Sequence, residues 1–307
     1  MGKISFVFAG QGAQYSGMGR ELYEMSAAAR KVFDTAEEIR PGTKAQCFSG
    51  TQEELNITKN TQPCLFCVDL AAAEALREAG IVPDMAAGFS LGEVAAVTFA
   101  GVFSQEDGFK LVTKRAEFMQ SAAEQADSAM AAVLKLDNAK VEALCTAHPG
   151  VYPVNYNSPG QLVVAGLKAA LPDFLADVSA AGGRAVPLAV SGGFHSPFMA
   201  QAARKLGEVL KETEVHTPAM PVYANFTAAP YTAEEAKQLL ETQVSHPVLW
   251  QQTVESMIAA GVDTFVEVGP GKTLSGLIKK TNRTVKIYNV ENAETLQKTV
   301  EALRVGE

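Results

Sequence analysis

Cysteine is scarce in this sequence, and its scarcity excludes a disulfide-stapled fold. Only four cysteines occur in 307 residues, too few for a disulfide framework in a chain of this length. Cys64 and Cys67 match C-x-x-C, but no second cysteine pair exists to complete a zinc site. Because they lie in an apolar stretch with helical character (62–71), we interpret them as core residues and expect neither a metal nor a redox cofactor.

Long hydrophobic runs and an excess of positive charge are also absent. No apolar run reaches the roughly 18 residues of a membrane helix, and the N-terminal residues MGKISFVF lack the long apolar region of a signal peptide. We therefore expect a cytoplasmic protein without a membrane partner. The formal net charge of -8 argues against nonspecific nucleic-acid binding, which needs a basic surface. With 47% hydrophobic and 20% charged residues, the composition is that of a soluble globular protein.

Short β-rich runs alternate with longer helical stretches along most of the chain. The runs 4–8, 85–89 and 264–268 are each followed by glycine and by a candidate helix, which is typical of parallel strands with crossover helices. A last amphipathic helix is expected after Glu291. The other main helices are expected at 21–40, 63–79, 91–100, 105–125, 197–213 and 251–260.

The segment from 128 to 190 has a different order of elements. Its pattern predicts strand, helix, strand, strand, helix and strand, which is the order of a ferredoxin-like unit. We therefore predict an α/β fold: a large α/β-hydrolase-like domain with a parallel sheet (1–127 and 191–307), interrupted by an inserted ferredoxin-like α+β lobe (128–190). The elements expected in the lobe are 130–136, 138–146, 151–157, 161–165, 168–181 and 184–188.

One serine has the surroundings of a catalytic nucleophile. Ser90 is the centre of GFSLG at 88–92, which fits G-x-S-x-G, with a strand expected before it and a helix after it. A sharp strand-to-helix turn lifts the serine clear of the backbone, and the start of the helix directs free N–H groups at the anion that forms on attack. The context favours a nucleophile over the alternative, a structural turn.

Histidine is scarce as well, which narrows the search for the base that a serine nucleophile needs. Of the four histidines, His148, His216 and His246 precede proline or Thr-Pro and resemble turn residues. His195 lies in the glycine-rich loop 191–195, a kind of loop that commonly carries catalytic groups. His195 is therefore the candidate base, with a surface loop histidine as the alternative. No acid between Ser90 and His195 lies in a motif that would complete a Ser-His-Asp triad.

One arginine adjoins the apolar stripe of the expected helix 105–125. Arg115 has Leu111, Val112, Phe118 and Met119 three and four positions away, so no acid can pair with it along the helix. An arginine against a core is costly unless it is paired. Its partner is therefore either a distant acid or the carboxylate of a substrate, which a guanidinium can hold with two hydrogen bonds.

Four blocks of the sequence resemble the malonyl-CoA:acyl carrier protein transacylases. They are FAGQGAQ at 8–14, GFSLGE at 88–93, GFHSP at 193–197 and EVGPGK at 267–272. The blocks follow the order of the family, and the resemblance spans essentially the whole chain. One departure is Phe89, where the family usually has histidine. This change should leave the geometry of the nucleophile intact, but it affects any contact of that histidine with an acyl group.

The resemblance implies a reaction and its partners. It implies an [acyl-carrier-protein] S-malonyltransferase that moves malonyl from coenzyme A to the phosphopantetheine thiol of acyl carrier protein through a malonyl-Ser90 intermediate, supplying fatty acid synthesis without a cofactor. Malonyl-CoA and acyl carrier protein are the expected partners. The alternatives are a discrete acyltransferase serving a polyketide synthase, a hydrolase, and a non-catalytic scaffold, the last disfavoured by intact Ser90, His195 and Arg115.

The resemblance also assigns roles around the serine and the histidine. It implies that a backbone carbonyl orients His195, with Gln243 at the matching position, and that the backbone N–H groups of Gln11 and Leu91 form the oxyanion hole. The alternative for Gln243 is a polar loop residue. For the glycine turn of Gln11 the alternative is a phosphate-gripping loop, although the turn does not match G-x-G-x-x-G.

Further roles concern the substrate. By resemblance, Arg115 binds the malonyl carboxylate. Phenylalanine at the position of Phe194 goes, in the family, with a preference for malonyl over branched acyl units. Asn157 and Gln161 match family positions near the site, although each can instead hold its turn by side-chain hydrogen bonds. Glu93 is expected to complement the start of its helix. The run between Glu267 and Glu291 contains no acid and five basic residues. It is either a local basic patch that binds an acidic carrier protein or a solvated helix face. The basic residues are Lys272, Lys279, Lys280, Arg283 and Lys286.

Overall fold

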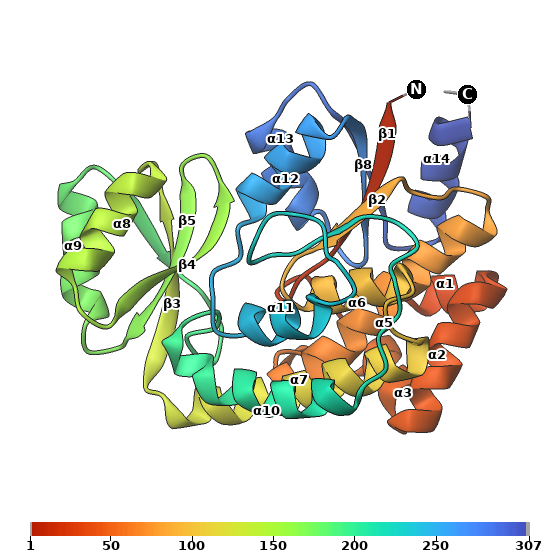
Figure 1. Ribbon diagram of the computed structural model, residues 1–307, viewed down its shortest axis with the longest axis horizontal. Coiled ribbons are helices and arrows are strands. Elements are labelled where there is room, and N and C mark those ends of the chain that lie inside the picture. The colour runs from red at the N-terminus through yellow and green to blue at the C-terminus, as the bar shows by residue number, and fades with distance from the viewer. Residues whose placement is uncertain (1, 305–307) are drawn as a thin grey trace.

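A five-stranded parallel sheet forms the centre of the larger part of the molecule (Figure 1). The computed structural model describes residues 2–304. The sheet order is β7-β2-β1-β8-β9, and every neighbouring pair is parallel. The three predicted strands are confirmed, whereas β7 and β9 were not predicted. The strands are β1 (Lys3–Phe8), β2 (Met85–Gly88), β7 (Val222–Tyr223), β8 (Val262–Val268) and β9 (Lys286–Val290).

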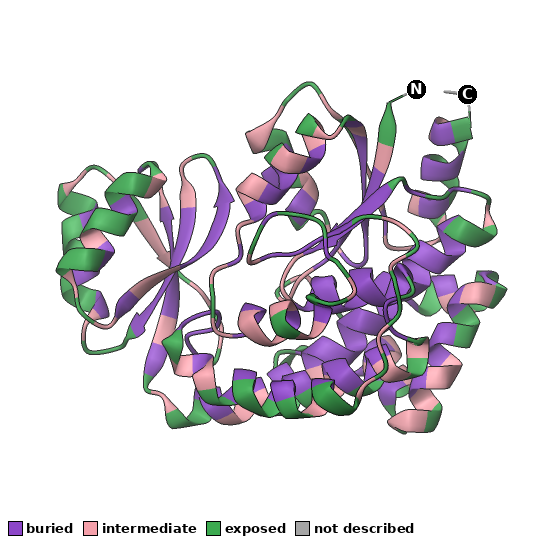
Figure 2. Cartoon of the chain, in the orientation of Figure 1, coloured by how far each residue is buried: buried purple, intermediate pink, exposed green. Residues whose placement is uncertain are grey.

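Helices cover both faces of this sheet, as the two-sided burial of its strands requires. In β1, Phe6 and Phe8 pack into the core that includes α5 and α6, while Val7 packs on the opposite side with α12 and α13. Figure 2 shows the burial concentrated in the strands and in the helices beneath them. The helices are α1 (Arg20–Met25), α2 (Ala27–Ile39), α3 (Thr43–Ser49), α4 (Gln52–Leu55), α5 (Thr58–Glu78), α6 (Leu91–Phe99), α7 (Gln105–Gln125), η1 (Pro197–Met199), α10 (Ala200–Glu212), α11 (Ala236–Gln243), α12 (Trp250–Ala259), α13 (Thr273–Thr281) and α14 (Ala293–Arg304).

Two predicted helix boundaries are wrong, and each has a local cause. The helix expected at 21–40 is two helices, α1 and α2, because Ser26 is extended and its side chain accepts a hydrogen bond from the N–H of Ala29, capping the second helix. The helix expected to begin near Pro63 begins at Thr58, so the proline lies in its second turn. No helix between residues 2 and 304 has the length and apolar character to cross a membrane.

The segment between α7 and η1 forms a separate antiparallel sheet, with the predicted order of elements confirmed. Its strand order is β4-β5-β3-β6, and two helices cover one face with a small core of their own. The other face packs toward the large part through Met130, Ala132 and Val163. The elements are β3 (Ser128–Leu134), α8 (Asn138–Ala147), β4 (Val151–Ser158), β5 (Gln161–Leu167), α9 (Leu171–Ala180) and β6 (Arg184–Pro187).

Two chain connections join the small sheet to the rest, and they are tied together. The N–H of Gly193 donates to Oγ of Ser128 at 2.9 Å, so the outgoing connection after α7 and the returning one before His195 meet at one hydrogen bond. The division into domains at 127/128 and 190/191 stays a prediction; Met1 and residues 305–307, the ends of the predicted large domain, lie outside the described residues.

Candidate active site

Ser90 lies on a tight turn between β2 and α6. Its backbone has φ 56° and ψ -108°, a sparsely populated conformation of the kind that clusters at active sites. Close approach explains the flanking glycines: a Cβ on Gly88 would lie 2.0 Å from the carbonyl carbon of Gly92, and one on Gly92 would lie 2.3 Å from the carbonyl oxygen of Phe8. The G-x-S-x-G pattern therefore lets β2 and α6 pack closely enough to project the serine.

The structure brings His195 against this serine. Nε2 of His195 lies 2.7 Å from Oγ of Ser90, and Nδ1 lies 2.8 Å from the backbone carbonyl of Gln243. Because a carbonyl only accepts, Nδ1 carries the proton and Nε2 is free to take one from the serine. Burial and the nearby Arg115 lower the pKa of His195 to about 4, so the imidazole is neutral near pH 7 and ready to act as a base.

The other histidines are engaged elsewhere. Nε2 of His148 lies 2.8 Å from a carboxylate oxygen of Asp177. Nδ1 of His246 lies 2.9 Å from the carbonyl of Thr242, and His216 lies 3.9 Å from Glu214. None of the three bonds to Ser90 among the described residues, which leaves His195 as the base that the geometry supports.

Two backbone N–H groups beside Ser90 are unused. Within residues 2–304, neither Gln11 nor Leu91 donates its N–H to any acceptor. Gln11 lines the cavity that contains Ser90 and His195, and its side chain is held by a 3.3 Å bond to Thr58. Unpaired donors at a helix start and an adjacent turn can bind a developing oxyanion; that role for this pair stays a prediction.

Arg115 is fully buried and contacts the nucleophile itself. One terminal nitrogen donates to Oε1 of Gln62 at 2.7 Å, and the other donates to Oε1 of Gln243 at 2.8 Å and to Oγ of Ser90 at 3.1 Å. No carboxylate among the described residues forms an ion pair with it, so its neighbours are neutral amide and hydroxyl oxygens. Burial lowers its pKa to about 10, which keeps the guanidinium charged at neutral pH.

The sequence did not reveal two residues that hold this arrangement. Oδ1 of Asn225 accepts the N–H of Ser90 at 2.7 Å, and its Nδ2 donates to the carbonyl of Gly88 at 2.6 Å. Oε1 of Gln62 accepts a hydrogen bond from the guanidinium of Arg115. A signal existed for Gln62, a polar residue inside an apolar helix, but Asn225 lies in no motif.

Glu93 lies where it was expected, in the first turn of α6, and its carboxylate is fully buried. It accepts hydrogen bonds from Gln243, from the N–H of Asn225 and from the hydroxyl of Tyr231. Besides its place at the helix start, the side chain is therefore part of the buried hydrogen-bond network behind Ser90.

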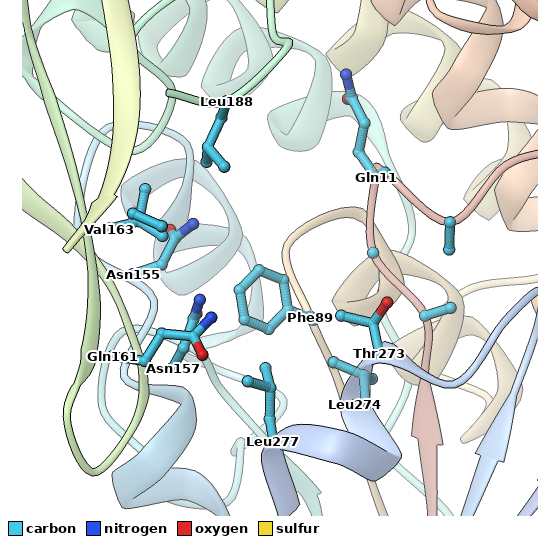
Figure 3. Close-up of a pocket in the computed structure, with 15 residues that line it drawn as sticks. Gln11, Phe89, Asn155, Asn157, Gln161, Val163, Leu188, Thr273, Leu274 and Leu277 are labelled. Carbon is cyan, nitrogen blue, oxygen red and sulfur yellow. The ribbon is translucent and has the colours of Figure 1, made fainter. Parts of the chain in front are cut away.

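Two adjoining cavities lead to the nucleophile. The inner one, of about 90 Å³, contains Ser90 and His195, and most of its other lining side chains are apolar, among them Phe194. The outer one, of about 250 Å³, lies between the end of the parallel sheet and the small sheet, and includes Asn157 and Gln161 (Figure 3). A short acyl group beside Ser90 and a longer arm reaching the surface fit this pair of cavities.

Phe89 stands between the two cavities. It lines both, and its ring packs edge-on against Trp250 with centroids 5.5 Å apart. Figure 3 shows the ring projecting toward Asn155 and Asn157. Phe89, the departure noted from the family resemblance, is therefore an apolar wall shared by the two cavities.

The chain matches a known protein family over nearly its whole length. The model of the acyl transferase domain matches residues 5–304. The chain belongs to the acyl transferase family. It is 40% identical to the malonyl CoA-acyl carrier protein transacylase of Bacillus subtilis over 312 residues, covering 99% of this chain and 98% of that one.

Solved structures of the acyl transferase family agree with the fold. The malonyl CoA-acyl carrier protein transacylase of Clostridium perfringens superposes with a TM-score of 0.95 at 38% identity, covering 98% of this chain and 97% of that one. A malonyl-transacylase in complex with its type II polyketide synthase acyl-carrier protein superposes with a TM-score of 0.94 at 36% identity, covering 98% and 99%. The predicted fold class, a parallel α/β part with a ferredoxin-like lobe, is confirmed.

Proposed function

We propose that this acyl transferase moves a malonyl group from coenzyme A to the phosphopantetheine thiol of acyl carrier protein, supplying fatty acid synthesis in the cytoplasm. The observation that carries the proposal is Arg115, a buried cation 3.1 Å from Oγ of Ser90 that contacts no carboxylate directly among residues 2–304. A malonyl thioester supplies a carboxylate that can contact it, which an acetyl thioester lacks. The names of the relatives at 36–40% identity support the same reaction.

In the first half-reaction, Ser90 becomes acylated. Its Oγ attacks the thioester carbonyl while His195 Nε2 takes the hydroxyl proton. The N–H groups of Gln11 and Leu91 bind the oxyanion of the tetrahedral intermediate, and Arg115 holds the malonyl carboxylate. The intermediate collapses with cleavage of the carbon–sulfur bond, and His195 returns the proton to the departing coenzyme A sulfur.

The second half-reaction reverses these roles. The carrier-protein thiol gives its proton to His195 and attacks the ester carbonyl, the carbon–oxygen bond to Ser90 breaks, and His195 reprotonates the serine. Malonyl leaves on the carrier-protein sulfur. The carbonyl of Gln243 keeps the imidazole in the same tautomer through both halves, the task that the acid has in a Ser-His-Asp triad.

We also propose that residues 128–190 act as an inserted lobe that covers the substrate. The inner face of the small sheet supplies Ala132, Asn155 and Val163 to the outer cavity. Asn157, whose Oδ1 is buried without a partner among the described residues, offers an acceptor to the N–H groups of a pantetheine arm. Phe194, in the inner cavity, limits the room for branched acyl groups.

Mixing the protein with malonyl-CoA tests the proposed function. Intact-mass analysis should show the added mass of one malonyl group, and peptide mapping should place it on Ser90. Ser90→Ala should show none, because it has no hydroxyl to acylate. Acetyl-CoA should acylate much more weakly, since Arg115 finds no carboxylate. Equal labelling of wild type and Ser90→Ala, or release of free malonate instead of transfer to a carrier-protein thiol, would contradict the proposal.

A charge reversal on α13 should separate the two half-reactions. Lys279 and Lys280 are exposed on this helix, Lys280 donates to Gln161 at 2.9 Å, and Leu277 of the same helix lines the outer cavity. The basic residues thus lie beside the mouth through which the acidic carrier protein must insert its thiol. We expect Lys279→Glu with Lys280→Glu to raise the KM for carrier protein roughly tenfold, with little change in acylation by malonyl-CoA.

The matched control is a double charge reversal elsewhere, Lys110→Glu with Lys114→Glu on the exposed side of α7. It changes net charge equally and should leave both half-reactions unchanged. A loss in both half-reactions, or in neither, would remove α13 as the docking surface. Comparing fatty-acid and polyketide carrier proteins in the same assay tests the second candidate partner, which the similarity to the polyketide complex favours.

A further inference from the structure

Glu93 is a buried carboxylate one turn after the nucleophile, and neutral groups surround it. Oε2 accepts from Nε2 of Gln243 at 2.8 Å and from the N–H of Asn225 at 3.2 Å, while Oε1 accepts from the hydroxyl of Tyr231. An isolated buried carboxylate is expensive, and none of these three donors carries a charge. The arrangement therefore calls for a charged partner further away.

That partner is Arg115, reached through one carboxamide. Gln243 donates Nε2 to Glu93 and accepts Arg115 at Oε1, 2.8 Å away, so the side chain bridges the anion and the cation. The same residue donates to the backbone carbonyl of Ser90 at 2.7 Å and accepts His195 on its own backbone carbonyl at 2.8 Å. A change at Glu93 is thereby transmitted to the nucleophile, to the base and to the cation.

The charges explain why an anion is needed there. When Ser90 attacks, His195 becomes an imidazolium, a form that burial disfavours and that the charge of Arg115 disfavours further unless a substrate carboxylate is paired with it. A negative Glu93 on the other side of Gln243 favours the imidazolium whether or not that carboxylate is bound. The titratable and charged groups that face Glu93 are Tyr231 from the loop before α11, Arg115 from α7 and, across Gln243, His195 from the loop before η1.

We propose that Glu93 is a positioning residue whose ionised carboxylate holds Gln243 and offsets the charge of Arg115, so that His195 can accept the proton of Ser90. The inference rests on the proposed transferase function and adds a member to its machinery. It also predicts a dependence on pH. Burial raises the pKa of Glu93 to about 7, so the active, charged form is lost as the pH falls through the neutral range.

The decisive variant is Glu93→Gln, which keeps the shape of the side chain and removes its charge. The rate of Ser90 acylation by malonyl-CoA should fall about tenfold, the effect of one pKa unit. The KM for malonyl-CoA should stay level or decrease, because the uncompensated Arg115 attracts the substrate carboxylate more strongly. In wild type the rate should rise as the pH passes about 7, and in Glu93→Gln this rise should be absent.

Two further variants separate the charge from the packing. Tyr231→Phe removes a hydrogen-bond donor that favours the charged form of Glu93. The rise of the acylation rate with pH should therefore move to higher pH, while the rate reached above that rise is retained. Glu74→Gln removes another largely buried carboxyl, paired with Arg77 on α5, and should change neither the rate nor its pH dependence.

The outcomes divide clearly. If Glu93→Gln keeps the wild-type rate and its rise with pH, the proposed role is wrong while the transferase function stands. If the variant raises KM and lowers the rate by a constant factor at every pH, together with a lower Tm, Glu93 supports only the fold and the proposal is overturned. If wild type takes up no malonyl group, the transferase function fails, and this inference fails with it.

Discussion

Replacing His195 with alanine is expected to slow the acylation of Ser90 by at least about ten-thousand-fold, the effect of removing the base from a serine–histidine pair. The reason is the 2.7 Å contact between Nε2 and Oγ. Among residues 2–304 it is the one hydrogen bond of Oγ with a group that can take its proton, since Arg115 only donates. Binding of malonyl-CoA should survive, because Arg115 remains. Quenched-flow measurement of malonyl-enzyme formation gives the rate.

A second histidine provides the control for this measurement. His148 is paired with Asp177 on the helical side of the small sheet, so His148→Ala should acylate at the wild-type rate. If His195→Ala retains more than a hundredth of the wild-type rate, another group acts as the base and the assignment of His195 is wrong.

Replacing Arg115 with alanine should reduce acylation by malonyl-CoA roughly 100- to 1000-fold, because it leaves the substrate carboxylate unpaired in a buried site. Acylation by acetyl-CoA should fall much less, by at most about tenfold, since Ser90 and Gln243 lose only one donor each. The ratio of the two initial rates is the measurement, because it cancels any general loss of active protein.

Arg115→Lys is the matched variant, and it should restore little malonyl transfer. An ammonium is a point charge and cannot bridge Gln62, Gln243 and a carboxylate as the planar guanidinium can. If Arg115→Ala lowers both rates by the same factor, the arginine serves the fold rather than the carboxylate. The choice of malonyl as substrate would then lose its main structural support.

Short-range patterns indicated the residues that the structure brings together around Ser90. The strand, turn and helix around Ser90 are contiguous in the chain, the glycine-rich loop marked His195 among only four histidines, and Arg115 stood out against an apolar helix face. In each case the signal is local: a tight turn, a glycine-rich loop or a charge beside the core without a partner along its own helix. The blocks that resembled the transacylases added the roles of Gln11 and Gln243.

Long-range contacts could not be predicted in this way. Asn225 binds the N–H of Ser90 across 135 residues of sequence, and no pattern within 224–226 indicates that partnership. The two-residue strand β7 is too short to show an alternating pattern. The break at Ser26 did have a signal, a serine before an alanine-rich run, but the continuous helical periodicity on either side outweighed it.

The hydrogen bond between Ser128 and Gly193 limits how this protein can be recombined with its relatives. The lobe enters and leaves the chain at two points that are joined there, one following the helix of Arg115 and the other preceding His195. If the lobe of a relative were transplanted with one of its two junctions between Ser128 and Gly193, one end of this hydrogen bond would come from each protein. The mismatch could then shift the positions of both Arg115 and His195. Chimeras joined before Ser128 and after Gly193 carry the bond as a unit, and these are the ones expected to retain transferase activity.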